Sequence, residues 1–240
     1  MSNIFDGAGE IAKREMVLFF LVDQSGSMEG TKMGQVNEAI REAIPMLRDV
    51  GGSDAKIKIA ALLFSSGCRW MYAEPIPVED FQWKPVDTFG VTDFGAACQE
   101  LAKKMSRKAF LKSPSASVAP AIFLMSDGQP TDEYKEGLEL LNKNSWFKHA
   151  IRVALAIGAD ADDNVLAEFT GTMEAVTRIY SPEALRKFIH FVTVKTAQIG
   201  TQWDSDGDPT KTRQDNMIQK LDDFLKDNPD INQNADDGGW

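Results

Sequence analysis

A run of seven apolar residues that ends in an aspartate limits the possible folds of this chain more than any other stretch. Residues 16–22 read Met-Val-Leu-Phe-Phe-Leu-Val, and Asp23, Ser25 and Ser27 follow them. A continuous apolar run of this length, bounded by turn residues, predicts a strand that is buried on both faces of a sheet. Such a strand would carry a carboxylate and two hydroxyls into the turn at its carboxyl end.

Two further stretches place oxygen-bearing side chains at corners of the same kind. Thr92 lies in Gly-Val-Thr-Asp-Phe-Gly, directly before a helical pattern, and Asp127 follows a second apolar run at residues 121–125. Ligand sites in open α/β sheets lie at the carboxyl ends of the strands. The side chains that we expect to converge there are Asp23, Ser25, Ser27, Thr92 and Asp127.

The order of the elements along the chain predicts the fold class. Apolar segments at 16–22, 56–64, 121–125, 150–157 and 175–180 alternate with helical patterns. This alternation indicates an α/β fold with a doubly wound, mainly parallel sheet and helices on both faces. A sixth strand, at 68–73, follows so short a turn that it must be an antiparallel edge strand. Helices are expected at 31–50, 93–106, 160–170 and 181–197, and around Leu138, Leu141 and Trp146.

Composition divides the chain of 240 residues into three parts. We interpret residues 1–14 as an N-terminal extension, 15–198 as one domain, and 199–240 as a C-terminal tail. The tail is rich in aspartate, which predicts a segment that is flexible or loosely docked, with few apolar residues to bury. Its one plausible short helix passes through Met217, Leu221 and Phe224.

Charge and cysteine usage exclude several functional classes. A net charge of −10 argues against nucleic acid as the main partner, because no basic stripe offsets the acidic excess. The apolar run at 16–22 is too short to span a membrane. Cys68 and Cys98 are the only cysteines, and the N-terminus lacks the pattern of a secretion signal. These features favour a cytoplasmic protein without a disulfide framework.

The five oxygen-bearing residues carry a resemblance to a known family. Asp23-x-Ser25-x-Ser27, the distant Thr92 and the later Asp127-Gly128 resemble the metal-ion-dependent adhesion site (MIDAS) of von Willebrand factor A (vWA) domains. The resemblance covers about residues 15–198. It implies a Rossmann-like fold and a bound divalent ion, usually Mg²⁺, with Mn²⁺ and Ca²⁺ as alternatives.

The residue types themselves favour binding over catalysis. Hard divalent ions take oxygen ligands, and the three hydroxyls here add no charge while Asp23 and Asp127 neutralise the ion only partly. The ion would stay attractive to a Glu or Asp of a partner protein, which would complete its coordination shell. The neighbouring residues that we expect to contact this partner are Met28, Asp93, Phe94 and Gln129.

Within the family, the chain resembles the TerY-like proteins of bacterial tellurite-resistance and stress-response clusters. The segments that carry this resemblance are 21–28, 92–97 and 125–132. It implies partnership with a kinase and a phosphatase encoded nearby. The acidic tail departs from the pattern of these proteins.

Two alternative functions remain open from the sequence. In a metal-dependent phosphohydrolase, Asp23 could act as a nucleophile at the end of its strand. Phosphatases of the haloacid-dehalogenase type need a second aspartate where Ser25 stands, and no lysine is obviously paired with the site. In a third hypothesis, a carboxylate of the acidic tail occupies the metal site of the same or a neighbouring molecule.

An aromatic segment without periodicity precedes Thr92. Phe81, Trp83 and Phe89 lie among prolines there. We favour the interpretation that these aromatic residues cover the edge of the sheet over the alternative that they form a partner surface, although binding residues often lie in loops.

Overall fold

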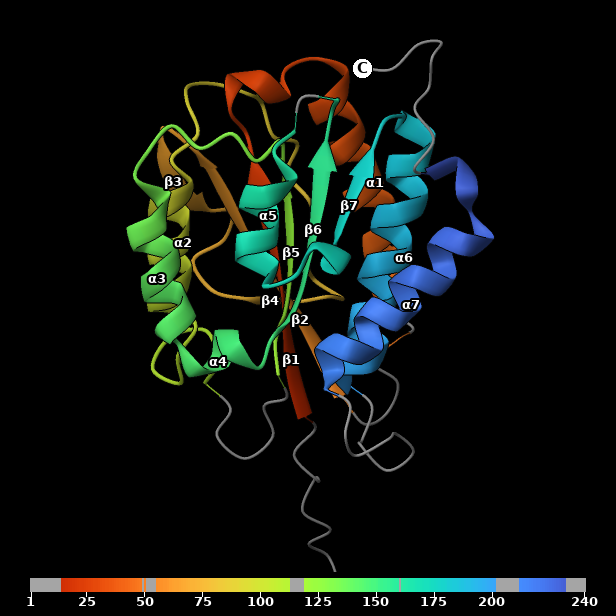
Figure 1. The fold of residues 1–240 in the computed structure, drawn as a ribbon. Coiled ribbons are helices and arrows are strands. Elements are labelled where there is room, and N and C mark those ends of the chain that lie inside the picture. The colour runs from red at the N-terminus through yellow and green to blue at the C-terminus, as the bar shows by residue number, and fades with distance from the viewer. Residues whose placement is uncertain are drawn as a thin grey trace, which may run out of the picture.

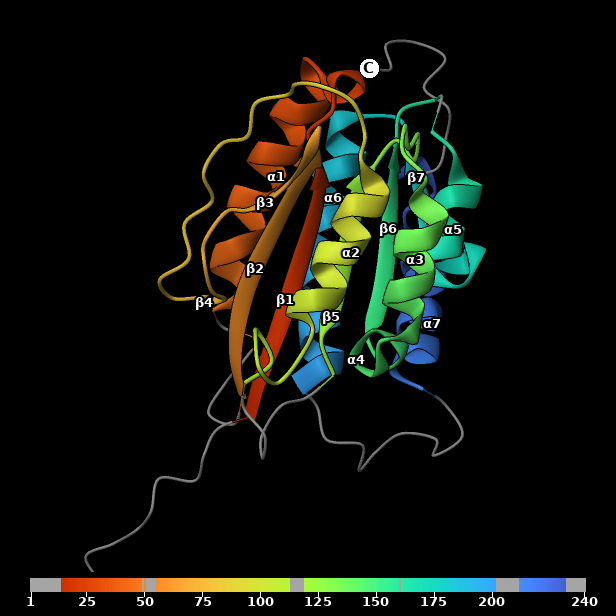
Figure 2. The same ribbon diagram turned by 90° about the vertical axis from the view of Figure 1, so that its left-hand side faces the viewer.

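A mixed, mainly parallel sheet forms the centre of the protein (Figures 1 and 2). The computed structural model describes residues 14–48, 50, 55–112, 119–159, 161–201 and 212–231. The strands are β1 (Arg14–Asp23), β2 (Ala55–Ser65), β3 (Gly67–Trp70), β4 (Ile76–Pro77), β5 (Ala121–Ser126), β6 (Ile151–Ile157) and β7 (Val176–Ile179). They lie in the order β3-β2-β1-β5-β6-β7, and β4 pairs with β2 outside this path.

Strand directions confirm the predicted fold class. β1, β2, β5, β6 and β7 pair in parallel, whereas β3 is an antiparallel edge strand beside β2. The seventh strand, β4, was not predicted and also runs antiparallel to β2. Its two residues are too few for a periodic pattern, and Pro77 has no amide hydrogen to donate to a ladder.

Helices cover both faces of the sheet. The α-helices are α1 (Thr31–Leu47), α2 (Phe94–Lys104), α3 (Tyr134–Lys143), α4 (Ser145–Lys148), α5 (Asp163–Thr170), α6 (Pro182–Thr201) and α7 (Arg213–Asp227). Three 3₁₀ turns complete the described elements: η1 (Gly26–Met28), η2 (Met173–Ala175) and η3 (Pro229–Ile231). In Figure 1, α2 and α3 lie on one side of the sheet, and α6 and α7 lie on the other.

Asn144 divides the helical region expected around Leu138 and Trp146 into α3 and α4. Its backbone is extended, and its side-chain Oδ1 accepts hydrogen bonds from the amides of Trp146 (2.8 Å) and Phe147 (3.3 Å). An asparagine that caps a helix start in this way satisfies amides that have no partner within the helix.

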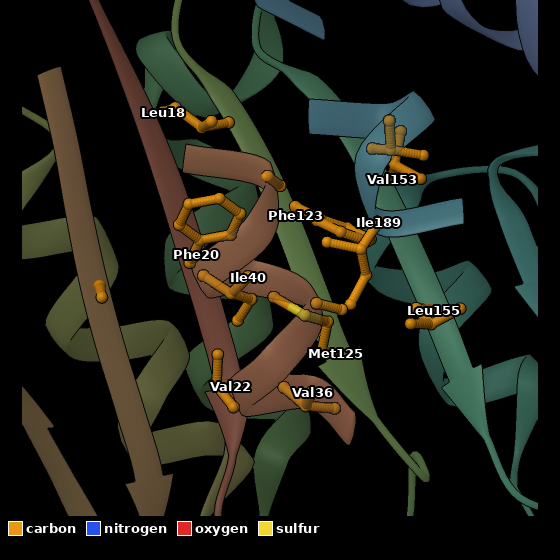
Figure 3. Packing of buried hydrophobic residues seen from close by; sticks show 14 of the residues in the cluster. Leu18, Phe20, Val22, Val36, Ile40, Phe123, Met125, Val153, Leu155 and Ile189 are labelled. Atoms are coloured by element: carbon orange, nitrogen blue, oxygen red, sulfur yellow. The ribbon is translucent and has the colours of Figure 1, made fainter. Parts of the chain in front are cut away.

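Strand β1 is buried on both faces, as its sequence predicts. Val17, Phe19 and Leu21 pack in the cluster that contains residues of α2, α3 and α5. The alternate residues pack against α1 and α6 in the other cluster. Figure 3 shows this second cluster, in which Leu18, Phe20 and Val22 lie with Phe123, Met125, Val36, Ile40 and Ile189. Each fully buried side chain of this size contributes about 2 kcal/mol, so β1 is firmly fixed.

The strand order creates a reversal point between β1 and β5. From β1 the chain adds β2 and β3 on one side, and it later adds β6 and β7 outward from β5 on the other side. Crossover connections leave in opposite directions from such a pair of neighbouring strands, which opens a crevice at their carboxyl ends. Asp23 ends β1 and Ser126 ends β5, so the fold places both residues at this crevice.

The helix predicted near Met217 and Leu221 exists, and it packs on the domain. Phe224 of α7 stacks on Phe191 of α6, with 3.9 Å between the ring centroids. Met217 and Leu221 are fully buried. For residues 212–231 the structure favours the docked alternative over a flexible segment, because their apolar side chains share one helix face that α6 covers.

A side-chain amide also fixes the start of α7 to the sheet. Gln214 accepts a hydrogen bond from the amide of Arg152 through Oε1 (2.8 Å) and donates one from Nε2 to the carbonyl of Arg152 (2.9 Å). Arg152 lies on β6 before its pairing with β7 begins at Ala154. The remaining predicted tail residues, 202–211 and 232–240, and most of the predicted N-terminal extension, 1–13, lie outside the described residues.

Candidate metal centre

Asp23 is a fully buried carboxylate at the end of β1. Its Oδ1 accepts a hydrogen bond from the amide of Ser25 (2.9 Å), and its Oδ2 accepts one from the hydroxyl of Ser126 (2.6 Å). The pairing of Val22 with Met125 sets the neighbouring strands in register, so that Ser126 comes to lie beside Asp23. Two adjacent strand ends thus fix the orientation of the carboxylate.

Burial makes the ionised form of Asp23 unfavourable. The pKa of this carboxyl group is raised to about 6, chiefly because burial removes its solvation; hydrogen bonds from Ser126 and Ser25 oppose the shift, and the nearby charge of Asp127 adds to it. Asp23 is thus a buried carboxyl group near a second one, and no cationic side chain is among the causes of its pKa shift. A bound positive ion would stabilise its ionised form.

The turn after β1 brings two hydroxyls side by side. The Oγ atoms of Ser25 and Ser27 are 3.0 Å apart and share a hydrogen bond. Ser25 is buried, whereas Ser27 is exposed in the 3₁₀ turn η1. The pair therefore extends from the buried carboxylate of Asp23 to the protein surface.

Asp127 supplies a second fully buried carboxylate, directly after β5. Its Oδ1 accepts a hydrogen bond from the amide of Gln129 (3.2 Å), but its Oδ2 has no hydrogen-bond partner. The following turn requires glycine: Gly128 has φ +68°, and a Cβ there would lie 2.5 Å from the carbonyl oxygen of Asp162. An unpartnered, buried carboxylate oxygen is costly, and a bound cation would satisfy it.

Thr92 is held at the same end of the sheet by paired loop contacts. Its amide donates to Oγ1 of Thr131 (3.0 Å), and its carbonyl accepts from the amide of Thr131 (2.9 Å). Thr92 lines one small pocket together with Ser126 and Gln129. The Thr92 loop and the strand end that carries Asp127 therefore meet.

The loop before Thr92 also contacts the turn that carries the serines. The amide of Gly26 donates to the carbonyl of Gly90 (3.1 Å), and the amide of Phe89 donates to the carbonyl of Gln24 (2.8 Å). These bonds link the three corners of the chain that the sequence singled out. The expected set is accordingly brought to one edge of the sheet: Asp23, Ser25, Ser27, Thr92 and Asp127.

The chemistry of these groups suits a hard divalent cation. They offer carboxylate and hydroxyl oxygens, which Mg²⁺, Mn²⁺ and Ca²⁺ accept as ligands. Within the part of the chain that the structure describes, no three His, Cys, Asp or Glu side chains are grouped as a metal site. A cation at this site would therefore depend on the hydroxyls of Ser25, Ser27 and Thr92 as well as on the two carboxylates.

The structure corrects part of the predicted partner-contact set. Met28 is fully buried and Phe94 is 3% exposed, so both belong to the core and cannot contact a partner in this conformation. Asp93 is half-buried, and its Oδ2 accepts a hydrogen bond from the amide of Gly67 (2.6 Å). Only Gln129 of the four predicted residues is exposed.

Ser126 is the site residue that sequence reasoning missed. It donates to Asp23 and accepts from the amide of Gly128 (2.9 Å), so it connects the two carboxylate-bearing corners. Its position directly before Asp127, on the strand next to β1, was the available signal. Using that signal required the strand order, which the sequence did not provide.

The fold and the position of the site define a broad class of protein domain. A doubly wound sheet with oxygen ligands from several corners at its carboxyl edge belongs to the α/β domains that bind at a strand-reversal point. The model of the von Willebrand factor type A domain matches residues 18–191, which is most of the chain. The chain belongs to this family.

Solved structures show the same fold at low sequence identity. The pilus adhesin SpaC from Lactobacillus rhamnosus GG, in its open conformation, matches with a TM-score of 0.61 and 13% identity, over 78% of this chain and 30% of SpaC. Proximal thread matrix protein 1 from the mussel byssus, solved with a zinc-occupied MIDAS motif, matches with a TM-score of 0.58 and 15% identity, over 78% of this chain and 48% of that one.

A third solved structure shows the same fold. The ArnB paralog VWA2 from Sulfolobus acidocaldarius matches with a TM-score of 0.55 and 18% identity, over 76% of this chain and 45% of that one. The chain thus spans less than half the length of each of these three proteins. None of the curated proteins matches it in sequence.

None of the helices in the described ranges is both long enough and apolar enough to cross a membrane.

Proposed function

We propose that this protein is a non-enzymatic, divalent-metal-dependent protein-interaction module with a MIDAS. In this proposal Asp23, Ser25, Ser27, Thr92 and Asp127 hold Mg²⁺, with Mn²⁺ and Ca²⁺ as alternatives. The carboxylate of a partner's Glu or Asp takes an open coordination position. The observation that carries the proposal is the second oxygen of Asp127, which is buried without a hydrogen-bond partner beside the buried carboxylate of Asp23.

The local charge favours a partner carboxylate over a neutral ligand. Asp23 and Asp127 are the only charged groups among the five candidate ligands, so these ligands supply at most two negative charges to a divalent ion. The hydroxyls of Ser25, Ser27 and Thr92 add no negative charge. A partner's carboxylate supplies charge from outside the chain, so it binds most strongly where the chain's own ligands are least charged.

Titration calorimetry with the full chain tests metal binding directly. We expect Mg²⁺ or Mn²⁺ to bind to the wild-type protein, and both Thr92→Ala and Asp127→Asn to weaken binding at least tenfold because each removes a ligand. Ser145→Ala, which changes an exposed serine on α4, is the matched control and should bind like the wild type. Unchanged binding in both site variants would refute the metal site.

The geometry gives little support to the phosphohydrolase alternative. Both oxygens of Asp23 already accept hydrogen bonds, and the side chain is fully buried, so neither oxygen is exposed for attack on a phosphoester. Hydrolysis of a generic phosphoester by the purified protein, lost in Asp23→Asn, would revive this alternative.

The cellular setting is proposed on the resemblance to TerY-like proteins. We place the protein in a bacterial tellurite-resistance or stress-response system, in the cytoplasm, with a kinase and a phosphatase of the same gene cluster as candidate partners. Co-purification of these enzymes with the wild-type protein but not with Thr92→Ala tests the assignment.

A further inference from the structure

Two exposed apolar side chains lie next to the candidate metal centre. Phe89 is 50% exposed and Val91 is 48% exposed, one on each side of Gly90 in the loop that leads to Thr92. The carbonyl of Gly90 accepts the amide of Gly26, between the two serines of the site. We call Phe89 and Val91 the apolar rim.

The backbone under the apolar rim is held in place on several sides. Phe89 donates its amide to the carbonyl of Gln24 (2.8 Å), and Val91 donates its amide to Oγ of Ser66 (3.3 Å). Gly90 between them has φ +71°, and a Cβ there would lie 2.3 Å from the same Ser66 Oγ. The rim is therefore preorganised, which lowers the entropy that a partner must remove on binding.

The same segment buries its other large apolar residues. Phe81, Trp83 and Val86 are 1%, 8% and 3% exposed and belong to the core cluster that α1 and α6 cover. Asn37 of α1 holds Trp83 and Val86 in place: its Oδ1 accepts hydrogen bonds from Nε1 of Trp83 (2.9 Å) and from the amide of Val86 (2.8 Å). The segment therefore buries these apolar side chains in the core, whereas that of Phe89 stays exposed.

The segment crosses the end of the molecule at which the metal ligands gather. Figure 2 shows it, in golden yellow, passing over the upper end of the sheet between β4 and α2. The hydrogen bonds that join Phe89 to Gln24 and Gly90 to Gly26 place the apolar rim beside the turn that carries Ser25 and Ser27.

Basic side chains stand beside the site in a protein of net charge −10. Nζ of Lys32 donates to the carbonyl of Ser27 (3.2 Å), and Nη2 of the exposed Arg69 donates to Oε1 of the buried Gln24 (3.3 Å). Arg69 forms no salt bridge with the carboxylates of the described residues. These cations offset the acidic background locally and complement an acidic partner segment.

We infer that the partner binds through an acidic residue next to a bulky apolar residue, on an exposed peptide segment. The carboxylate completes the shell of the ion, and the apolar side chain packs on Phe89 and Val91. This inference rests on the proposed metal-dependent function and adds the sequence preference of the partner.

Selection from a random peptide library displayed on phage tests the preference. The full-length protein is loaded with Mg²⁺, and bound phage are eluted with EDTA. We expect the enriched peptides to contain Asp or Glu with Leu, Ile, Phe or Met within two positions. Synthetic versions of these peptides should bind Phe89→Ser and Val91→Thr about tenfold more weakly than the wild type.

Control variants separate this inference from the proposed function. Leu140→Gln and Met173→Gln change exposed apolar residues on α3 and η2, which are 48% and 49% exposed, and should leave peptide binding unchanged. Enriched peptides that are acidic but lack apolar neighbours, or bind equally to Phe89→Ser, would overturn the inference alone. Recovery of no Mg²⁺-dependent peptide, or equal binding to Thr92→Ala, would count against the metal-dependent function itself. Competition by inorganic phosphate but not by acetate would assign the site to a phosphorylated ligand and likewise overturn the inference.

Discussion

At the scale of single residues, the site combines two carboxylates that the fold treats differently. Both oxygens of Asp23 accept hydrogen bonds, whereas Oδ2 of Asp127 accepts none. Asp23 is therefore oriented by the chain itself, through Ser25 and Ser126. Asp127 keeps an oxygen for a ligand from outside the chain.

The raised pKa of Asp23 predicts a characteristic dependence of stability on pH. Without metal, the folded protein holds a proton on Asp23 up to a pKa of about 6, while the ordinary value of 3.8 applies after unfolding. The folded state binds more protons between these two pH values, so stability falls as pH rises from about 4 to 6. The difference of about two pH units corresponds to about 2 to 3 kcal/mol.

Denaturant unfolding in EDTA at pH 7 and at pH 4 measures this effect. From pH 7 to pH 4, the wild type should gain about 2 kcal/mol of unfolding free energy relative to Asp23→Asn, which cannot titrate at this position. Asp87→Asn, at an exposed aspartate, should follow the wild type. If the wild type and Asp23→Asn changed in parallel, Asp23 would not have a raised pKa.

At the scale of the elements, the contact between α2 and α3 sets the position of the Thr92 loop. A Cβ on Gly137 of α3 would lie 2.3 Å from the carbonyl oxygen of Gly95 in α2, so these helices touch through their backbones. Asp132, before α3, accepts hydrogen bonds from the amides of Gly95 and Ala96 (both 3.1 Å). The first turn of α2, directly after Thr92, is thereby fixed.

We predict that Gly137→Ala destabilises the protein by about 1 to 3 kcal/mol, the range typical of an overpacked contact between rigid elements. The added methyl group must push α2 and α3 apart, so Mg²⁺ binding through Thr92 should also weaken. Gly34→Ala is the control, because a Cβ at Gly34 in α1 meets no atom within 4 Å. That change should leave stability equal or improve it by about 0.5 to 1 kcal/mol.

Thermal unfolding of the two variants gives the comparison. A destabilisation of Gly34→Ala as large as that of Gly137→Ala would show that a general effect of alanine, and not the helix contact, is responsible.

At the scale of the whole molecule, the family fold continues into a further helix. The matched family region ends at residue 191, and α7 begins at Arg213. α7 reaches the sheet through Gln214 and covers α6 with Phe224. The carboxylates of its outer face remain in water while its apolar face joins the core cluster of α1 and α6.

Truncation of a buried side chain in α7 tests whether this helix is part of the cooperative unit. Leu221→Ala should destabilise the protein by about 2 to 5 kcal/mol, as expected for a fully buried leucine. Lys220→Ala changes a neighbouring side chain that is 54% exposed and should alter stability by less than about 0.5 kcal/mol. Equal melting temperatures for wild type and Leu221→Ala would show that α7 detaches before the domain unfolds.

The sequence alone determined the class of fold and the five candidate ligands. Short continuous apolar runs such as 16–22, bounded by turn residues, fit strands inside a covered sheet, and the alternation with helices makes that sheet mainly parallel. Parallel strand ends then bring Asp23 and Asp127 to the same edge. This reasoning needs only the periodicity of the chain and the types of residue at the strand ends.

Only the tertiary structure decided which side chains around the site are accessible. The local sequence cannot tell whether Met28 and Phe94, or Phe89 and Val91, are buried, because apolar character does not specify which residues the helices cover. The first pair is buried and the second is about half exposed. The hydrogen bond between Ser126 and Asp23 depends on the order of the strands. The packing of α7 depends on apolar side chains that α6 presents to it, such as Phe191. These are contacts between segments far apart in the chain, which no local pattern of residues can encode.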